Sequence, residues 1–199
     1  MGKVHPQALV SSTPCYLTSK QESFTVWMKS LVLSGKGCTV FDSDGHVVYR
    51  VDNYDCKSRK QVHLMDFKGE VLFTILRKKF KLFGFWEGYR SSGSEIDKTK
   101  PGFQVRKTLR LIRGDSPCKV TVGLDKNQAS QYKIGSWSSK SAYKIVDKFG
   151  VAIAEVKRKQ SACGVVLGED VLSMVVEPCI DHSLIMGLVL VYSLINSKM

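Results

Sequence analysis

The feature that most limits how this chain can fold is an uncharged apolar segment near its C-terminus. No side chain between His182 and Lys198 carries a full charge, and residues 183–195 are apolar on all sides rather than along one stripe. A surface helix cannot sustain such a composition, so the segment must be buried in protein or in lipid. Pro178 ends the preceding β pattern and Asp181 stands at an N-cap position, which predicts a helix over about 182–195.

The length of this segment separates the two environments. Its thirteen apolar residues would extend about 20 Å as a helix, whereas a helix that spans a bilayer needs about twenty residues. We therefore expect no transmembrane span and a core helix enclosed by other elements. Gly187 would then mark a close approach of a strand to the helix backbone.

The rest of the chain has the pattern of an all-β fold. Short runs rich in Val, Ile, Phe, Tyr and Thr alternate with turn residues, and Asp-x-x-Gly recurs at 42–45, 66–69 and 147–150. In each copy Asp accepts a backbone hydrogen bond and Gly supplies a positive φ, which predicts a hairpin. The strands expected besides these hairpins are 24–33, 82–90, 103–113, 118–124, 131–137 and 170–177.

About a dozen strands in one domain favour a closed barrel. The predicted fold is therefore mainly β, a closed antiparallel barrel of about twelve strands around the buried C-terminal helix. Residues 1–22 form an irregular lead-in that either packs on the surface or stays mobile, and residues 23–199 form a single domain. Residues 90–102 are the clearest long loop, but strands resume at Phe103, so no domain boundary is expected there.

The chain is strongly basic. It has 30 Lys and Arg against 18 Asp and Glu, a net charge of +12. An acidic membrane surface or a nucleic acid is therefore a plausible partner, although a well-spread basic surface also serves solubility alone.

The basic residues are densest directly after two alternating strands. A period of two continues Phe73 and Ile75 into the first group, and Val151 and Ile153 into the second, which predicts cations on the core-facing side but beyond the edge of the core. Such a rim could meet acidic lipid headgroups. The alternative is that these charges only discourage edge pairing between strands. The candidate acidic-lipid-binding residues are Arg77, Lys78, Lys79, Lys81, Lys157, Arg158 and Lys159.

Catalytic and metal-binding motifs are missing from the sequence. The six cysteines form no C-x-x-C pair, and no two of the four histidines have the i, i+3 or i, i+4 spacing of ligands on one helix face. There is no G-x-S-x-G elbow, and residues 34–39 lack the spacing of a P-loop. We expect no metal, no cofactor, no disulfide and no enzymatic activity. A catalytic pair assembled from distant residues stays open, because one sequence does not show spatial neighbours.

Several segments, in their order along the chain, resemble the LURP-one-related (LOR) family of plants, within the wider group of tubby C-terminal domains and phospholipid scramblases. The terminal apolar helix completes the resemblance, which covers almost the whole chain. The segments that carry it are residues 24–29, 41–45, 49–52, 76–79, 135–137, 153–156 and 167–170.

The resemblance implies a twelve-stranded, tubby-like barrel around a central helix. It also implies a non-enzymatic binding or tethering protein, similar to membrane-tethered transcription regulators or lipid-handling proteins, with a role in plant defence and in phosphoinositide binding. The expected partner is an acidic membrane lipid or a protein. The expected location is the cytoplasm, the periphery of the plasma membrane or the nucleus.

Two other functions are weighed beside this one. A basic nucleic-acid-binding module would suit the charge, but the only helix is needed in the core and none is left to enter a groove. A scramblase-like membrane protein would require the terminal helix to enter the bilayer.

Overall fold

Each predicted Asp-x-x-Gly segment forms a hairpin turn. In the computed structural model, Asp42 Oδ1 accepts hydrogen bonds from the backbone N–H groups of Asp44 at 2.9 Å and His46 at 2.8 Å. The same pair of bonds, each 2.9 Å long, forms in the turns that begin at Asp66 and Asp147. The glycine that closes each turn has a φ between +84° and +89°, a conformation that favours glycine.

The structure describes residues 16–28, 36–53, 61–80, 83–92, 95–96, 100–108, 117–123, 129–136, 142–161 and 163–196. Within them lie thirteen strands, all paired antiparallel. Their bounds are β1 Glu22–Trp27, β2 Lys36–Phe41, β3 Val47–Asn53, β4 Gln61–Asp66, β5 Val71–Phe80, β6 Phe83–Ser92, β7 Glu95–Ile96, β8 Phe103–Lys107, β9 Cys118–Val122, β10 Ser130–Ser136, β11 Tyr143–Val146, β12 Ala152–Arg158 and β13 Val171–Val176.

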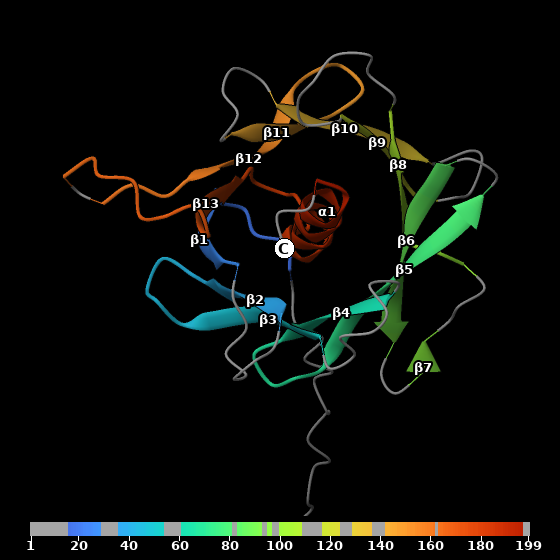
Figure 1. Ribbon diagram of the computed structural model, residues 1–199, viewed down its shortest axis with the longest axis horizontal. Coiled ribbons are helices and arrows are strands. Elements are labelled where there is room, and N and C mark those ends of the chain that lie inside the picture. Colours follow the sequence, from blue (N-terminus) through green and yellow to red (C-terminus); the bar gives the residue numbers. More distant parts are fainter. Residues whose placement is uncertain are drawn as a thin grey trace, which may run out of the picture.

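Twelve of these strands close into a ring. Each pairs with its neighbours in the chain, and β1 pairs with β13 while β5 pairs with β6 and β6 with β8, so no gap is left. The two-residue β7 pairs only with β6, outside the ring. A closed antiparallel ring needs an even number of strands, and twelve satisfies this. The predicted barrel is confirmed, and Figure 1 shows the ring with the helix at its centre.

The ends of several strands differ from the prediction. β1 ends at Trp27 and β8 at Lys107, where longer strands were expected, and residues 29–35 and 109–116 lie outside the described part of the chain. β5, in contrast, continues through its charged residues to Phe80, because it stays paired with β6 as far as Phe83.

The predicted helix is confirmed at both ends. Helix α1 spans His182–Ile195 and is the only helix in the described residues. Every residue from 185 to 192 is buried, on all sides of the helix, because the barrel surrounds it. No helix in the described ranges combines the length and the apolarity that crossing a membrane requires.

The N-terminus of the helix is fixed by polar contacts at one end of the barrel. Asp181 Oδ1 accepts from the backbone N–H groups of Ser183 at 2.9 Å and Leu184 at 3.2 Å, so Asp181 is the predicted N-cap. Its other oxygen accepts from Arg90, near the end of β6. The described part of the lead-in also contacts the start of the helix, since the Tyr16 carbonyl accepts a hydrogen bond from the backbone N–H of His182 at 3.0 Å.

We call this end of the barrel the basal end; it also holds the three Asp-x-x-Gly turns. The opposite end is the distal end. Because neighbouring strands are antiparallel, β5, β8 and β12 all finish at the distal end.

A buried hydrogen bond ties the first residue of α1 to the barrel wall. Tyr49 Oη and His182 Nδ1 lie 2.5 Å apart, and Tyr49 is fully buried. Burial raises the pKa of the Tyr49 hydroxyl, which therefore stays protonated and shares this hydrogen bond with the imidazole. Burial also lowers the pKa of His182, although the nearby carboxylates of Asp181 and Glu22 oppose that shift. The imidazole is consequently neutral at pH 7.

One aromatic ring packs closely against both the helix and the barrel wall. Phe103 of β8 lies between Gly187 of the helix and Gly88 of β6. A Cβ added at Gly187 would lie 3.2 Å from the Phe103 ring, and one added at Gly88 would lie 2.1 Å from it. The expected close approach at Gly187 is therefore present, and a side chain of the wall makes it.

Deleting residues 182–199 should abolish folding, because the inward side chains of the barrel would lose the helix that they pack on. Far-ultraviolet circular dichroism and a thermal scan of the truncated chain test this. A cooperative transition with native-like β signal in the truncated chain would show that the barrel stands without its helix.

Gly88→Ala should destabilise the fold by about 1–3 kcal/mol or more, because the added methyl overlaps the Phe103 ring in a packed core. Gly187→Ala should reduce the stability less, because the Phe103 ring needs to shift by only a few tenths of an ångström to make room for the methyl group. Urea denaturation of both variants gives the comparison. Equal stability of Gly88→Ala and the wild type would mean that the wall opens freely there.

The free energy of unfolding should decrease as the pH is lowered below about 6.5. The reason is that His182 takes up a proton near its ordinary pKa of 6.5 in the unfolded chain, whereas burial lowers its pKa in the folded chain. His182→Gln retains an acceptor for Tyr49 but does not titrate, so its unfolding free energy should fall less between pH 7.5 and 5. Identical slopes for the wild type and His182→Gln would exclude His182 as the cause.

Candidate functional site: the basic distal end of the barrel

The two predicted basic groups lie at the same end of the barrel. β5 and β12 both finish at the distal end, so Arg77, Lys78 and Lys79 share that end with Lys157, Arg158 and Lys159. They do not form one cluster, because six strand-to-strand steps of the twelve separate β5 from β12. The groups therefore stand on opposite sides of the ring. Lys81, the remaining predicted residue, lies outside the described residues.

The β5 group confirms the predicted alternation. Phe73 and Ile75 are buried against the core, and Arg77 and Lys79 continue the same face but are exposed. Arg77 pairs with Trp86 of β6, the last buried residue on that side, so the cations begin where the core ends. Lys78 points to the outer face, where its ammonium lies 3.9 Å from a Glu87 oxygen and 5.6 Å from the centre of the Tyr89 ring.

The β12 group corrects the prediction. Ala154 and Val156 face the core, because they pair with the buried Val176 and Met174 of β13. Val151 is exposed, and Ile153 is buried beside the register shift, so the predicted row does not continue from Ile153 to Lys157. The register shift in the β11–β12 pairing lies between Ile145 and Val146, next to the start of β12. Lys157 is consequently on the outer surface and does not continue the core-facing row.

The β12 cations are also engaged by other residues. Lys157 Nζ lies 2.8 Å from Glu155 Oε2, and an Arg158 guanidinium nitrogen lies 2.7 Å from Glu169 Oε1. Lys159 donates to the Thr25 hydroxyl. This half of the prediction is the weaker candidate, since its charge is partly neutralised within the protein.

The fold adds cations that the sequence analysis did not select. Arg106 and Lys107 end β8, Lys119 lies near the start of β9, and all three are exposed at the distal end beside the β5 group. Lys107 lies on the same side of β8 as Phe103 and Val105, the side that faces the core. β6 lies between β5 and β8, and its residue opposite Lys79 is Gly84. Because glycine has no side chain, nothing on β6 stands between Lys79 and the end of β8. Only the strand register shows that these residues are neighbours.

We name Arg77, Lys79 and Lys107 the distal rim. None of the three forms an ion pair with any residue that the structure describes. Cations that lie close together without a counter-charge create a positive potential. The distal rim is therefore an exposed and positively charged surface.

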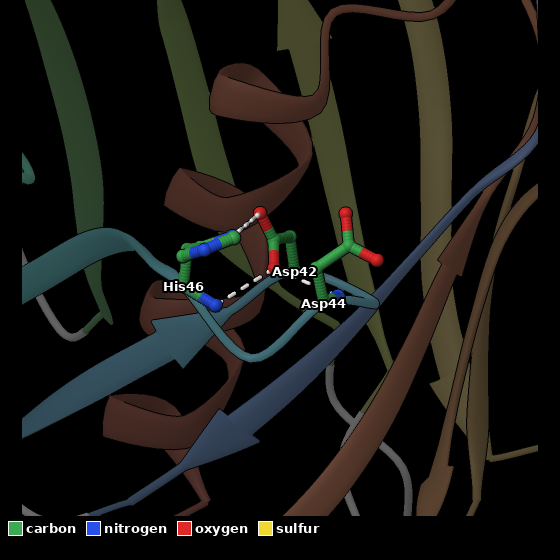
Figure 2. A group of neighbouring side chains, drawn as sticks. All are labelled: Asp42, Asp44 and His46. Carbon is green, nitrogen blue, oxygen red and sulfur yellow. Dashed lines mark hydrogen bonds and ion pairs between the residues drawn. The ribbon is translucent and has the colours of Figure 1, made fainter.

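A second group of polar side chains lies at the basal end, in the turn of β2 and β3. Ligand atoms of Asp42, Asp44 and His46 all lie within 4.8 Å of one another, and His46 Nδ1 is 3.5 Å from Asp42 Oδ2 (Figure 2). Backbone hydrogen bonds from His46 and Asp44 help to lower the pKa of Asp42. The turns at Asp66 and Asp147 use the same backbone bonds without a neighbouring histidine, so turn geometry explains the position of Asp42.

The cysteines are also placed by the structure. None of the four described ones, Cys38, Cys118, Cys163 and Cys179, is in a disulfide. Burial raises the pKa of the Cys118 thiol to about 12, even though the charge of Lys107 lowers it. A thiol with so high a pKa is not a nucleophile at neutral pH.

Comparison with known proteins places the chain in a family. The sequence profile described as LURP-one-related matches residues 22–193. Protein LURP-one-related 11 of Arabidopsis thaliana is 48% identical over 207 residues, which cover 98% of this chain and 89% of the relative. Protein LURP-one-related 3 of the same plant is 48% identical over 191 residues, covering 92% of this chain and 84% of the relative.

A solved structure has the same fold. An Arabidopsis thaliana protein known by X-ray structure matches with a TM-score of 0.65 at 16% identity, over 91% of this chain and 94% of the other. At that identity the likeness concerns the fold alone. The sequence matches and the twelve-stranded barrel agree, and the chain belongs to the LURP-one-related family.

Proposed function

We propose that this protein is a non-enzymatic binding module that docks on acidic membrane surfaces through the distal rim. The observation that carries the proposal is that Arg77 and Lys79 of β5 and Lys107 of β8 stand exposed on the two sides of β6 and form no ion pair with a described residue. Each cation near an anionic membrane contributes about 1 kcal/mol of attraction. Three of them support reversible, peripheral attachment at the cytoplasmic side of a membrane.

The distribution of charge supports a defined orientation. The cations of β5, β8 and β9 gather at the distal end, whereas the basal end carries both signs of charge, with Asp42 and Asp147 in its turns and Asp181 paired with Arg90. A molecule with this distribution would turn its distal end toward an anionic surface. The basal end would then face away from the membrane.

A non-enzymatic role is supported by the state of the buried reactive groups. His182 is used to hold the start of α1, and its hydrogen-bond partner is a tyrosine hydroxyl with a raised pKa. Cys118 is a buried protonated thiol. Neither is prepared for nucleophilic or acid–base catalysis at an accessible site.

Sedimentation with vesicles tests the proposal. The wild type should co-sediment with vesicles of phosphatidylcholine mixed with phosphatidylserine or phosphoinositide, and not with phosphatidylcholine alone. Binding should weaken as salt rises from 0.1 M to 1 M, since the Debye length shrinks from about 10 Å to about 3 Å. The combined variant Arg77→Glu, Lys79→Glu, Lys107→Glu should lose several kcal/mol of attraction at roughly 1 kcal/mol per cation.

The control variant is Lys20→Glu, Lys68→Glu, Lys148→Glu, which makes the same change in net charge at exposed lysines away from the distal end. It should bind acidic vesicles as the wild type does. Equal loss in both variants would show that net charge, rather than the distal rim, governs binding. A wild type that ignores all acidic vesicles would refute the proposal outright.

A further inference from the structure

A row of four cationic side chains and one phenylalanine crosses the outer surface of five consecutive strands of the ring, from β5 to β10. In the strand register Lys78 pairs with Phe85, Phe85 with Arg106, Arg106 with Lys119, and Lys119 with Lys133. Directly paired residues project on the same side of a sheet, so these five side chains form one continuous line. With strands about 4.8 Å apart, its four steps span roughly 19 Å. We call it the outer row.

The outer row is separate from the distal rim. Val105, Val120 and Ile134 alternate with its cations along β8, β9 and β10 and are completely buried. The cations therefore point away from the core, and Arg106, Lys119 and Lys133 are exposed. The residues of the distal rim, in contrast, lie on the side of their strands that faces the core. The two groups thus lie on different faces of the same strands.

The outer row is electrostatically unfavourable in the protein by itself. Arg106, Lys119 and Lys133 stand directly opposite one another, and like charges in directly opposite positions destabilise a sheet. None of the three forms an ion pair with a described residue. A bound anion would remove this repulsion.

The row next to it is polar and almost uncharged. Glu87 pairs with Gln104, Gln104 with Thr121, and Thr121 with Gln131. Its one carboxylate is occupied, because Glu87 accepts from Tyr89 Oη at 2.6 Å and from Gln104 Nε2 at 3.1 Å. Gln104 Oε1 accepts from Arg106 Nε at 2.7 Å, so this amide holds the guanidinium in place. The Thr121 hydroxyl and the Gln131 amide accompany the cations as hydrogen-bond donors and acceptors.

The shape of the outer row decides between kinds of anion. It covers four of the twelve steps around the closed ring, roughly a third of the circumference. A flat bilayer would touch only part of such a convex arc, whereas a flexible chain with regularly spaced negative charges can follow all of it. The shape therefore favours a linear polyanion over a membrane.

We propose that the outer row binds single-stranded nucleic acid. Phe85 and Arg106 favour it over an acidic peptide, because the Arg106 guanidinium lies 5.1 Å from the centre of the Phe85 ring and the pair offers planar surfaces on which a base can stack. The cations hold successive phosphates, and the polar row contacts sugars and base edges. Recognition on a sheet surface needs no helix in a groove.

Fluorescence anisotropy with a labelled oligouridylate of about twelve nucleotides tests this proposal, since single-strand sites take about 4–16 nucleotides. Binding should weaken with salt with a logarithmic slope near −2.8, about −0.7 for each of four cations. In Lys119→Gln, Lys133→Gln the slope should fall to about −1.4. The matched control, Lys68→Gln, Lys148→Gln at the basal end, should retain the wild-type slope and affinity.

A variant that gains stability while it loses binding would exclude misfolding as the cause of the lost binding. Lys119→Glu places a carboxylate between Arg106 and Lys133, so it should raise the melting temperature while it weakens oligonucleotide binding. Vesicle binding should fall far less in Lys119→Glu than in the combined variant Arg77→Glu, Lys79→Glu, Lys107→Glu, which separates the outer row from the distal rim. Oligouridylate that does not bind, or that binds Lys119→Gln, Lys133→Gln and the wild type equally, overturns the proposal. Polyglutamate that binds as tightly as oligouridylate also overturns it and indicates an acidic protein segment instead.

Discussion

Burial of one uncharged helix on all sides is the constraint on which the rest of this structure depends. A sandwich or a single sheet covers an element on one or two sides, but α1 exposes apolar groups around its whole circumference and needs a wall that closes. The antiparallel ring provides that wall. The Phe103 ring fills the space that Gly88 and Gly187 leave free. The Asp181 cap, the Arg90 contact and the Tyr49–His182 bond fix where the helix enters.

Closure of the ring also arranges the charges. Because antiparallel strands alternate in direction, strand ends that are far apart in sequence return to the same end of the barrel. Arg77 and Lys107 become neighbours across β6 in this way, whereas Lys157 arrives at the same end on the opposite side. Topology thus brings separate basic segments of the chain to the same end of the barrel.

Alternation within strands divides the same basic segments into two surfaces. Arg77 and Lys79 continue the core-facing side beyond the core, while Lys78 and Arg106 belong to the outer face. One flat anionic surface can meet the distal rim, and one flexible anionic chain can follow the outer row. The two proposed ligands therefore use different residues and respond to different variants. Membership of the LURP-one-related family is compatible with either binding mode.

The sequence by itself determined the helix, its cap, the three Asp-x-x-Gly turns and the closed barrel, because each depends on local spacing or on the apolarity of a single segment. It also placed Arg77 and Lys79 correctly, since β5 alternates without interruption. The reversed parity of β12 could not be predicted, because a register shift between β11 and β12 is a property of the pair. Only the tertiary structure decided that Arg106, Lys119 and Lys133 form a line. Their alignment depends on the register between paired strands, which the sequence of one strand does not contain.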